Sequence, residues 1–311
     1  MISVVVPCHC DGEGAYLTLC SARSQADFHG IPAEFILVND HGTDPTVNSA
    51  EPQLLGVTVF NGRWGSPQAS RDRGIRAANH PWVLCLDSHV ILSVGALPAL
   101  LDVAQAQPKA GLVFPAMTLF SAEPKHLGYS IAWDSHLWHN GYLTHTPEQI
   151  ERGMKAKGPY QPFRLGIASH GAFLVNREAY LQTGGYTLEQ RGWGGEETYL
   201  GLMMWLMGWE SWMVPGEYHW HYTGNRRAHG LVSKSAEYVR NFLVAAYLLG
   251  GMRQLTVAQL WFSSRCVDPI GLMLKEVVNT CAAERNRIEA GPFGGDLLRL
   301  TEFFAQEGIL C

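Results

Sequence analysis

The chain of 311 residues lacks several features that would place it in a familiar class. Its seven cysteines are odd in number and scattered, and no pair has the spacing of a zinc ribbon. One of them, Cys85, lies in a predicted central strand, so we expect reduced thiols and a cytoplasmic protein. Only 16% of the residues are charged and the net charge is −5, which argues against nonspecific binding of polyanions, although a local basic patch could still exist.

Long apolar runs, internal repeats and low-complexity tracts are also missing. The most apolar stretches of the second half, Tyr199–Met213 and Phe242–Met252, are too short or too interrupted to span a bilayer, so we expect no membrane span. Because the chain opens directly into an apparent strand, Ile2–Val6, we expect no signal peptide. In contrast, the chain is rich in aromatic residues, with ten Trp and eleven Tyr, as is common in carbohydrate enzymes.

Short apolar runs alternate with helical patterns along the first two thirds of the chain. The predicted strands are Ile2–Val6, Phe35–Val38, Val57–Phe60, Trp82–Leu86, Leu112–Phe114 and Ala172–Val175. The predicted helices are Ala15–Gln25, Pro67–Ala78, Gly95–Gln105, Ser235–Gly250 and Pro269–Arg287. Such alternation predicts an α/β fold with a doubly wound, mostly parallel sheet flanked by helices. We expect a sheet domain over residues 1–225 and a helical C-terminal extension over 226–311 that caps it.

A polar triplet, Asp87-Ser88-His89, ends the apolar strand Trp82–Leu86. Ligands of open α/β sheets bind at the carboxyl ends of such strands. On an extended backbone, Asp87 and His89 point in the same direction and could share a divalent cation. The alternative is an ordinary polar turn at a strand end.

Several motifs in a fixed order resemble a known family. They are Ser3–Pro7, Phe35–Asp40, Leu86–His89, Gly184–Tyr186, Gly192–Glu197, Val214–Pro215 with His221, and the aromatic segment Ile131–Trp138. Over roughly residues 1–225 the chain is similar to the catalytic domain of GT-A glycosyltransferases of the family-2 type. The triplet Asp-Ser-His and the Trp-Gly-Gly-Glu segment look most like the polypeptide N-acetylgalactosaminyltransferases. We expect no counterpart of that family's lectin domain or of its membrane anchor.

The resemblance implies a UDP-sugar site built from residues of the first half and of the centre. It suggests roles in donor binding for Pro7, His9, Asp40, Arg71, Asp87, Ser88, His170, Gly194 and Gly195. Asp40 would meet the uracil or ribose, and the alternative is that it is only part of an Asx turn over Asn39–Gly42. Arg71 suits the base and diphosphate as a permanent cation, whereas Arg73 is read as an exposed helix charge. A hydrogen bond from His170 to the sugar and a place for it at the core edge are equally compatible with the sequence.

The same resemblance implies that Asp87, His89 and His221 bind Mn²⁺, or else Mg²⁺. His221 is expected after a short strand, Ser211–Val214, and His219 could substitute for it. The run Cys8-His9-Cys10 lacks the spacing of a structural zinc site and is not read as one.

Trp193–Glu197 resembles the acceptor-side motif, with Trp193 as a stacking face and Glu196 and Glu197 opening a helix. Its glycines would let the backbone approach the sugar closely. An acid in a first helical turn is also favoured by the helix dipole, which accounts for one Glu. Retaining relatives have Asn where this chain has Glu197, whereas inverting enzymes place a general base there, so the stereochemistry is open and Glu197 is the candidate base.

These patterns predict a metal-dependent enzyme that transfers GalNAc, GlcNAc, Gal or Glc from a UDP-sugar to an acceptor hydroxyl. The acceptor could be a peptide, a glycan or a hydroxymethylated DNA base. The alternative is a catalytically impaired nucleotide-sugar-binding protein. A nucleotidyltransferase is disfavoured because the loop after the first strand contains no Lys or Arg before Arg23.

Overall fold

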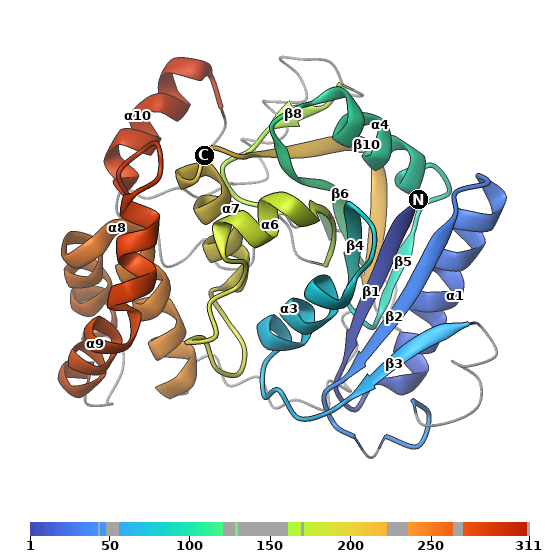
Figure 1. The fold of residues 1–311 in the computed structure, drawn as a ribbon, viewed down its shortest axis with the longest axis horizontal. Coiled ribbons are helices and arrows are strands. Elements are labelled where there is room, and N and C mark those ends of the chain that lie inside the picture. Colours follow the sequence, from blue (N-terminus) through green and yellow to red (C-terminus); the bar gives the residue numbers. More distant parts are fainter. Residues whose placement is uncertain are drawn as a thin grey trace.

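A ten-stranded mixed sheet forms the centre of the protein (Figure 1). The computed structural model describes residues 1–42, 44–47, 56–120, 128–129, 161–168, 171–222, 236–263 and 270–309. The strands are β1 (Ile2–Cys8), β2 (Ala33–Asn39), β3 (Val57–Asn61), β4 (Trp82–Leu86), β5 (Val90–Leu92), β6 (Ala110–Phe120), β7 (Gly128–Tyr129), β8 (Phe163–Arg164), β9 (Ala172–Asn176) and β10 (Glu210–Tyr222).

The strand order is β3-β2-β1-β4-β9-β6-β10-β5, with β7 beside β6 and β8 beside β10. The longest ladders, β1 with β2 and β6 with β10, are parallel. β9 is inserted antiparallel between β4 and β6. The predicted α/β architecture with a mostly parallel sheet is confirmed, and so is each of the predicted strands.

Helices cover both faces of this sheet. They are α1 (Gly12–Phe28), α3 (Pro67–Ala77), α4 (Ala96–Ala106), α6 (Arg177–Thr183), α7 (Glu196–Leu206), α8 (Ala236–Ser263), α9 (Ile270–Glu289) and α10 (Leu297–Glu307). β1 is buried along its whole length because side chains on both of its faces are covered. Val4 and Val6 pack with α1 and α4 in one apolar cluster, whereas Val5 packs with α3, α6 and α7 in the other.

The C-terminal helices lie on the far side of α7 from the sheet (Figure 1). α8 packs against α7 and α9, and α10 packs against α7. Their apolar residues continue the same cluster that covers one face of the sheet. The predicted helical extension is therefore present, and it reaches the sheet through α7. The expected boundary near residue 225 lies outside the described residues. Within those residues, no helix is long and apolar enough to cross a bilayer.

The prediction that the last strand ends at Val214 was wrong. β10 runs from Glu210 to Tyr222, with an irregularity between Val214 and Tyr218, so His221 lies within the strand and not after it. Pro215 and Gly216, which has φ of +87°, interrupt the apolar pattern and suggest a strand end. Pairing with β6 and β5 carries the strand past them.

Candidate metal and sugar-nucleotide site

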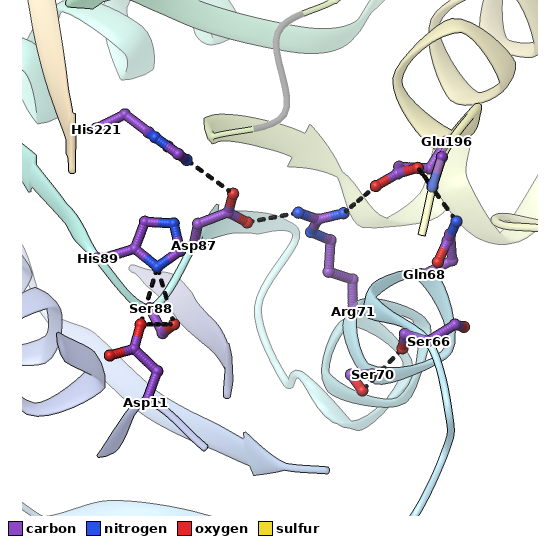
Figure 2. Close-up of polar contacts among 11 residues, drawn as sticks. Asp11, Ser66, Gln68, Ser70, Arg71, Asp87, Ser88, His89, Glu196 and His221 are labelled. Atoms are coloured by element: carbon purple, nitrogen blue, oxygen red, sulfur yellow. Dashed lines mark hydrogen bonds and ion pairs between the residues drawn. The ribbon is translucent and has the colours of Figure 1, made fainter. Parts of the chain in front are cut away.

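Three side chains that could bind a metal meet at one edge of the sheet (Figure 2). Asp87 follows β4, His89 precedes β5, and His221 lies near the end of β10. Antiparallel pairing of β5 with β10 aligns Val90 with His221 and so brings His221 beside His89. Asp87 Oδ2 lies 3.4 Å from His221 Nε2, and the two imidazole centroids are 4.6 Å apart. The fold therefore brings together the three residues that the sequence indicated.

The donor set and its spacing fit a divalent cation. Each residue offers one ligand atom, and these atoms all lie within 4.8 Å of one another. Two atoms that share an ion at about 2.2 Å are at most about 4.4 Å apart, so only a small side-chain shift is needed to close the cluster. One carboxylate and two imidazoles form a mixed oxygen and nitrogen donor set for a divalent cation.

Asp11, which the sequence reading missed, fixes the orientation of His89. Its Oδ2 lies 2.9 Å from His89 Nδ1 and also accepts a hydrogen bond of 2.8 Å from Ser88 Oγ. With Nδ1 held by this carboxylate, Nε2 of His89 faces Asp87, as Figure 2 shows. A carboxylate behind a ligating histidine fixes its tautomer and raises its basicity. A sign of this role was present in the sequence: Asp11 follows β1, whose carboxyl end lies at the same edge of the sheet as that of β4.

Arg71 lies between the three candidate metal ligands and the start of α7 (Figure 2). It is only 4% exposed, its Nη2 pairs with Asp87 Oδ1, and its Nη1 lies 3.8 Å from Glu196 Oε1. Burial by itself would raise the pKa of the Asp87 carboxyl, but Arg71, and then His221 and His89, hold that pKa well below its usual range. Asp87 is therefore ionised and ready to act as a ligand.

Local sequence explains why α3 can present Arg71 here. Ser66 caps the helix by accepting from Ala69 N at 3.1 Å, and Pro67 occupies the first turn. Gly74 lies directly against Val5 of β1, where a Cβ would clash. The helix thus approaches the sheet closely, which buries Arg71. Arg73 instead lies over the Phe60 ring, 4.5 Å from its centroid, which accords with its reading as a helix charge away from the site.

Glu196 is a buried anchor between α7 and α3. Its Oε2 accepts from Gly194 N at 2.9 Å and from Gln68 Nε2 at 3.2 Å. Gln68 was not recognised in the sequence, and no local pattern marks it. Glu197 belongs to α7, but its side chain lies outside the described part of the structure.

The glycines of the acceptor-side motif have a structural reason that the sequence reading did not foresee. Gly194 and Gly195 have φ of +114° and +79°, which side chains rarely adopt, and Gly195 precedes α7 as its N-cap. A Cβ on Gly194 would lie 2.6 Å from the Tyr238 ring of α8. Trp193 stacks on the same ring, at 5.7 Å between centroids and 26° between planes. These glycines therefore admit α8, whether or not a sugar also approaches them.

Asp40 anchors the loop between β3 and α3. Its carboxylate accepts from Trp64 N and, at 3.0 Å, from Gly65 N, and it lies 3.8 Å from His9 Nδ1. The Asx turn that was the alternative reading of Asn39–Gly42 is present, since Asn39 Oδ1 accepts from His41 N at 3.2 Å.

The remaining predicted residues divide into placed and unplaced ones. Pro7 lies in β1 opposite Val38 of β2. His219 is fully buried, and burial, followed by the neighbouring His221, lowers its pKa to about 3. It is not one of the three grouped ligands in the described residues. His170 and the segment Ile131–Trp138 lie outside the described residues.

The mostly parallel sheet flanked by helices, with a carboxylate and two histidines where its strands end, has the GT-A fold. Residues 3–183 match the family model described as Glycosyl transferase family 2. The chain belongs to that family, whose members are glycosyltransferases that use nucleotide-sugar donors.

Similar proteins agree with this assignment. The chain is 25% identical over 211 residues to Polypeptide N-acetylgalactosaminyltransferase 4 of Caenorhabditis elegans, covering 66% of this chain and 35% of that protein. It is 29% identical over 217 residues to N-acetylgalactosaminyltransferase 6 of Drosophila melanogaster, covering 66% and 31%. For the human Polypeptide N-acetylgalactosaminyltransferase 16 the values are 24% over 251 residues, covering 77% and 43%. The chain thus spans less than half of the length of these relatives.

Two solved structures share the fold. A crystal structure of GalNAc-T7 with UDP, GalNAc and Mn²⁺ superposes with a TM-score of 0.66 at 15% identity, covering 99% of this chain and 57% of that one. Residues 1–349 of TarS from S. aureus superpose with a TM-score of 0.55 at 13% identity, covering 99% and 91%. At these identities the likeness shows the fold alone.

Proposed function

We propose that the protein is a metal-dependent glycosyltransferase that transfers a sugar from a UDP-sugar to an acceptor hydroxyl. The observation that carries this proposal is the cluster of Asp87, His89 and His221 at the edge of a family-2 sheet. The relatives are named as N-acetylgalactosaminyltransferases, so GalNAc is the first donor sugar to test, followed by GlcNAc, Gal and Glc.

The proposed donor chemistry depends on charge at the diphosphate. A bound Mn²⁺ would neutralise the diphosphate and stabilise UDP as the leaving group. Asp87 and the two histidines would hold it, with Asp11 orienting His89. Arg71, which pairs with Asp87 and lies 3.8 Å from Glu196, adds a fixed positive charge beside these ligands.

Uridine recognition is proposed at the ends of β1 and β2. Asp40 is held by two main-chain amides, but a carboxylate can accept about four hydrogen bonds and retains capacity for the uracil N3–H. Pro7 and His9 line the same strand end. Ser88 supports the site through Asp11.

On the acceptor side we propose Glu197 as the general base of an inverting displacement, with Glu196 and Trp193 positioning the substrate. Glu196 is buried and bonded to Gly194 and Gln68, which suits a supporting role and not proton transfer to solvent or substrate. The acceptor is proposed to be a hydroxyl of a peptide, a glycan or a hydroxymethylated base. A cytoplasmic location is proposed from the odd number and scattered positions of the cysteines in the sequence.

Calorimetry with UDP tests the donor site directly. Wild-type protein should bind UDP more tightly with Mn²⁺ than without it, and Asp87→Ala should remove that difference. Asp102→Ala, a loss of the same charge on the exposed face of α4, should behave as wild type. Metal-independent binding by the wild type would refute the metal assignment.

Mass spectrometry of products from a panel of UDP-sugars and acceptors then tests transfer. UDP binding with Mn²⁺ but neither transfer nor donor hydrolysis would establish the alternative, a nucleotide-sugar-binding protein without catalysis.

A further inference from the structure

We propose that Asn241 of α8 is a positioning residue that holds the acceptor loop, residues Gln190–Gly195, in the conformation used for transfer. The C-terminal helices would then be part of the catalytic unit. The functional half of this inference rests on the proposed function, whereas the conformational half does not.

Asn241 is fully buried, and its amide is bonded to the main chain of the acceptor loop. Its Oδ1 accepts from Arg191 N at 2.8 Å. Its Nδ2 donates to Arg191 O at 2.6 Å and to Trp193 O at 3.3 Å. The partners are main-chain groups with fixed polarity, so the orientation of the amide is unambiguous. One side chain therefore pairs with this loop much as a neighbouring strand would.

Tyr238 lies one turn before Asn241 on the same face of α8 and holds the next part of the loop. Trp193 stacks on its ring, and Gly194 passes so close that a Cβ would clash with it. Phe242 packs against Tyr238 at 4.8 Å between centroids and supports that ring. The indole and the backbone of the acceptor loop are thus shaped by a helix that follows the sheet domain.

The segment that leads into the acceptor loop is tied to the same helices by charge. Arg240, which is 5% exposed, pairs with Glu189 Oε2 at 2.9 Å and with Glu276 of α9 at 3.1 Å. Glu284 of α9 accepts from Thr187 Oγ1 at 2.8 Å and from Tyr199 OH at 2.6 Å. Through these contacts α8 and α9 hold the residues on both sides of the loop in place.

The C-terminal end of the loop is connected to the metal ligands through Glu196 and Arg71. Gly194 N donates to Glu196, and Glu196 faces Arg71, which pairs with Asp87. The metal ligands themselves come from β4, β5 and β10 and do not depend on α8 for their position. Loosening the loop should therefore disturb the positioning of the sugar and the acceptor, which meet Trp193–Gly195, while leaving the binding of UDP and metal almost unchanged.

Asn241→Asp is the sharpest test because it preserves size but puts a carboxylate against two carbonyl oxygens. Loss of two net hydrogen bonds predicts amide hydrogen exchange about 10- to 100-fold faster in peptides covering residues 190–196. Asn286→Asp, the same change at an exposed position of α9, is the control and should exchange as wild type. Tyr238→Ala should loosen the same peptides, whereas Tyr238→Phe should keep the stacking face and restore protection.

Kinetics with UDP-GalNAc and Mn²⁺ provides the functional readout. For Asn241→Asp we expect kcat for transfer, with an acceptor that reacts in the panel, to fall at least tenfold. The UDP affinity measured by calorimetry and the slow hydrolysis of donor by water should stay within about twofold of wild type. A purely structural role would lower transfer and hydrolysis together.

Three results would overturn the inference. Unchanged exchange of the loop in Asn241→Asp would refute the holding role. An equal fall of hydrolysis, donor affinity and transfer would reduce Asn241 to general stability. If the wild type neither binds UDP nor transfers sugar, the proposed function and the role in transfer fail together, while the exchange experiment still decides whether Asn241 holds the loop.

Discussion

Replacing Asp11 by Ala should weaken binding of Mn²⁺ without removing any metal ligand. Asp11 holds His89 Nδ1 at 2.9 Å, and without it the imidazole is left with the longer contact to Ser88 Oγ at 3.3 Å, so its orientation and tautomer are less well fixed. The variant should fold normally, because Asp11 stands at the N-cap of α1 without making a side-chain cap bond. Loss of the bonds to His89 and Ser88 should also lower the thermal stability, so metal affinity is the readout that reports on the metal site.

The expected size follows from the exposure of the pair. A hydrogen bond to a charged group contributes about 1.5–3 kcal/mol, but the Asp11 side chain is 34% exposed, so solvent screening favours the lower value. A loss of about 1.4–2 kcal/mol corresponds to a dissociation constant about 10- to 30-fold higher. Asp11→Asn keeps an oxygen that can accept from Nδ1 and should lose less than Asp11→Ala.

Titration of Mn²⁺ followed by electron paramagnetic resonance measures this affinity directly. Asp27→Ala removes the same charge at the other end of α1, where the side chain is 73% exposed, and should leave the affinity unchanged. If Asp11→Ala binds Mn²⁺ like the wild type while His89→Ala does not, Asp11 does not orient the histidine. If both variants bind normally, the metal site itself is wrongly assigned.

Three further outcomes are expected. Glu197→Gln should lower turnover about 10²–10⁴-fold with donor binding intact if Glu197 is the general base; an α-linked product from the α-linked donor, read by NMR couplings, would instead indicate retention. UDP should compete for the donor site better than GDP or ADP at equal concentration. Stronger competition by GDP would refute uracil recognition by Asp40. Burial would raise the pKa of Glu34, but hydrogen bonds from Ser3 and Asn79 outweigh it and lower that pKa. The ionised Glu34 therefore stabilises the fold above the unfolded pKa of about 4.3, and this contribution is lost as the pH falls through the lower folded pKa. Urea unfolding should accordingly show Glu34→Gln about 1 kcal/mol less stable than wild type at pH 7, after allowance for solvent screening, with the gap closing towards pH 3, and a gap that does not narrow would contradict this.

The sequence alone was enough to predict the sheet and one end of the metal site. Strands such as Trp82–Leu86 are continuous apolar runs because both of their faces are buried, and that pattern is local. The positions of Asp87 and His89 follow from the same strand, since a polar triplet that ends a parallel strand must lie at its carboxyl edge. His221 was placed by its motif, although the end of its strand was not.

Only the tertiary structure decided what surrounds these residues. The pairing of Asp11 with His89 joins positions 78 residues apart, and that of Gln68 with Glu196 joins positions 128 apart. Neither contact has a local signature, because it depends on which strand ends and helices the topology brings together. The contact of the acceptor loop with α8 also has no local signature. Its glycines suggested a nearby sugar in the sequence, but in the fold Gly194 lies directly against Tyr238 of α8. The period of apolar residues in the sequence specifies a helix and its apolar face. The polar partners of that helix are set instead by packing against segments that are distant in the sequence.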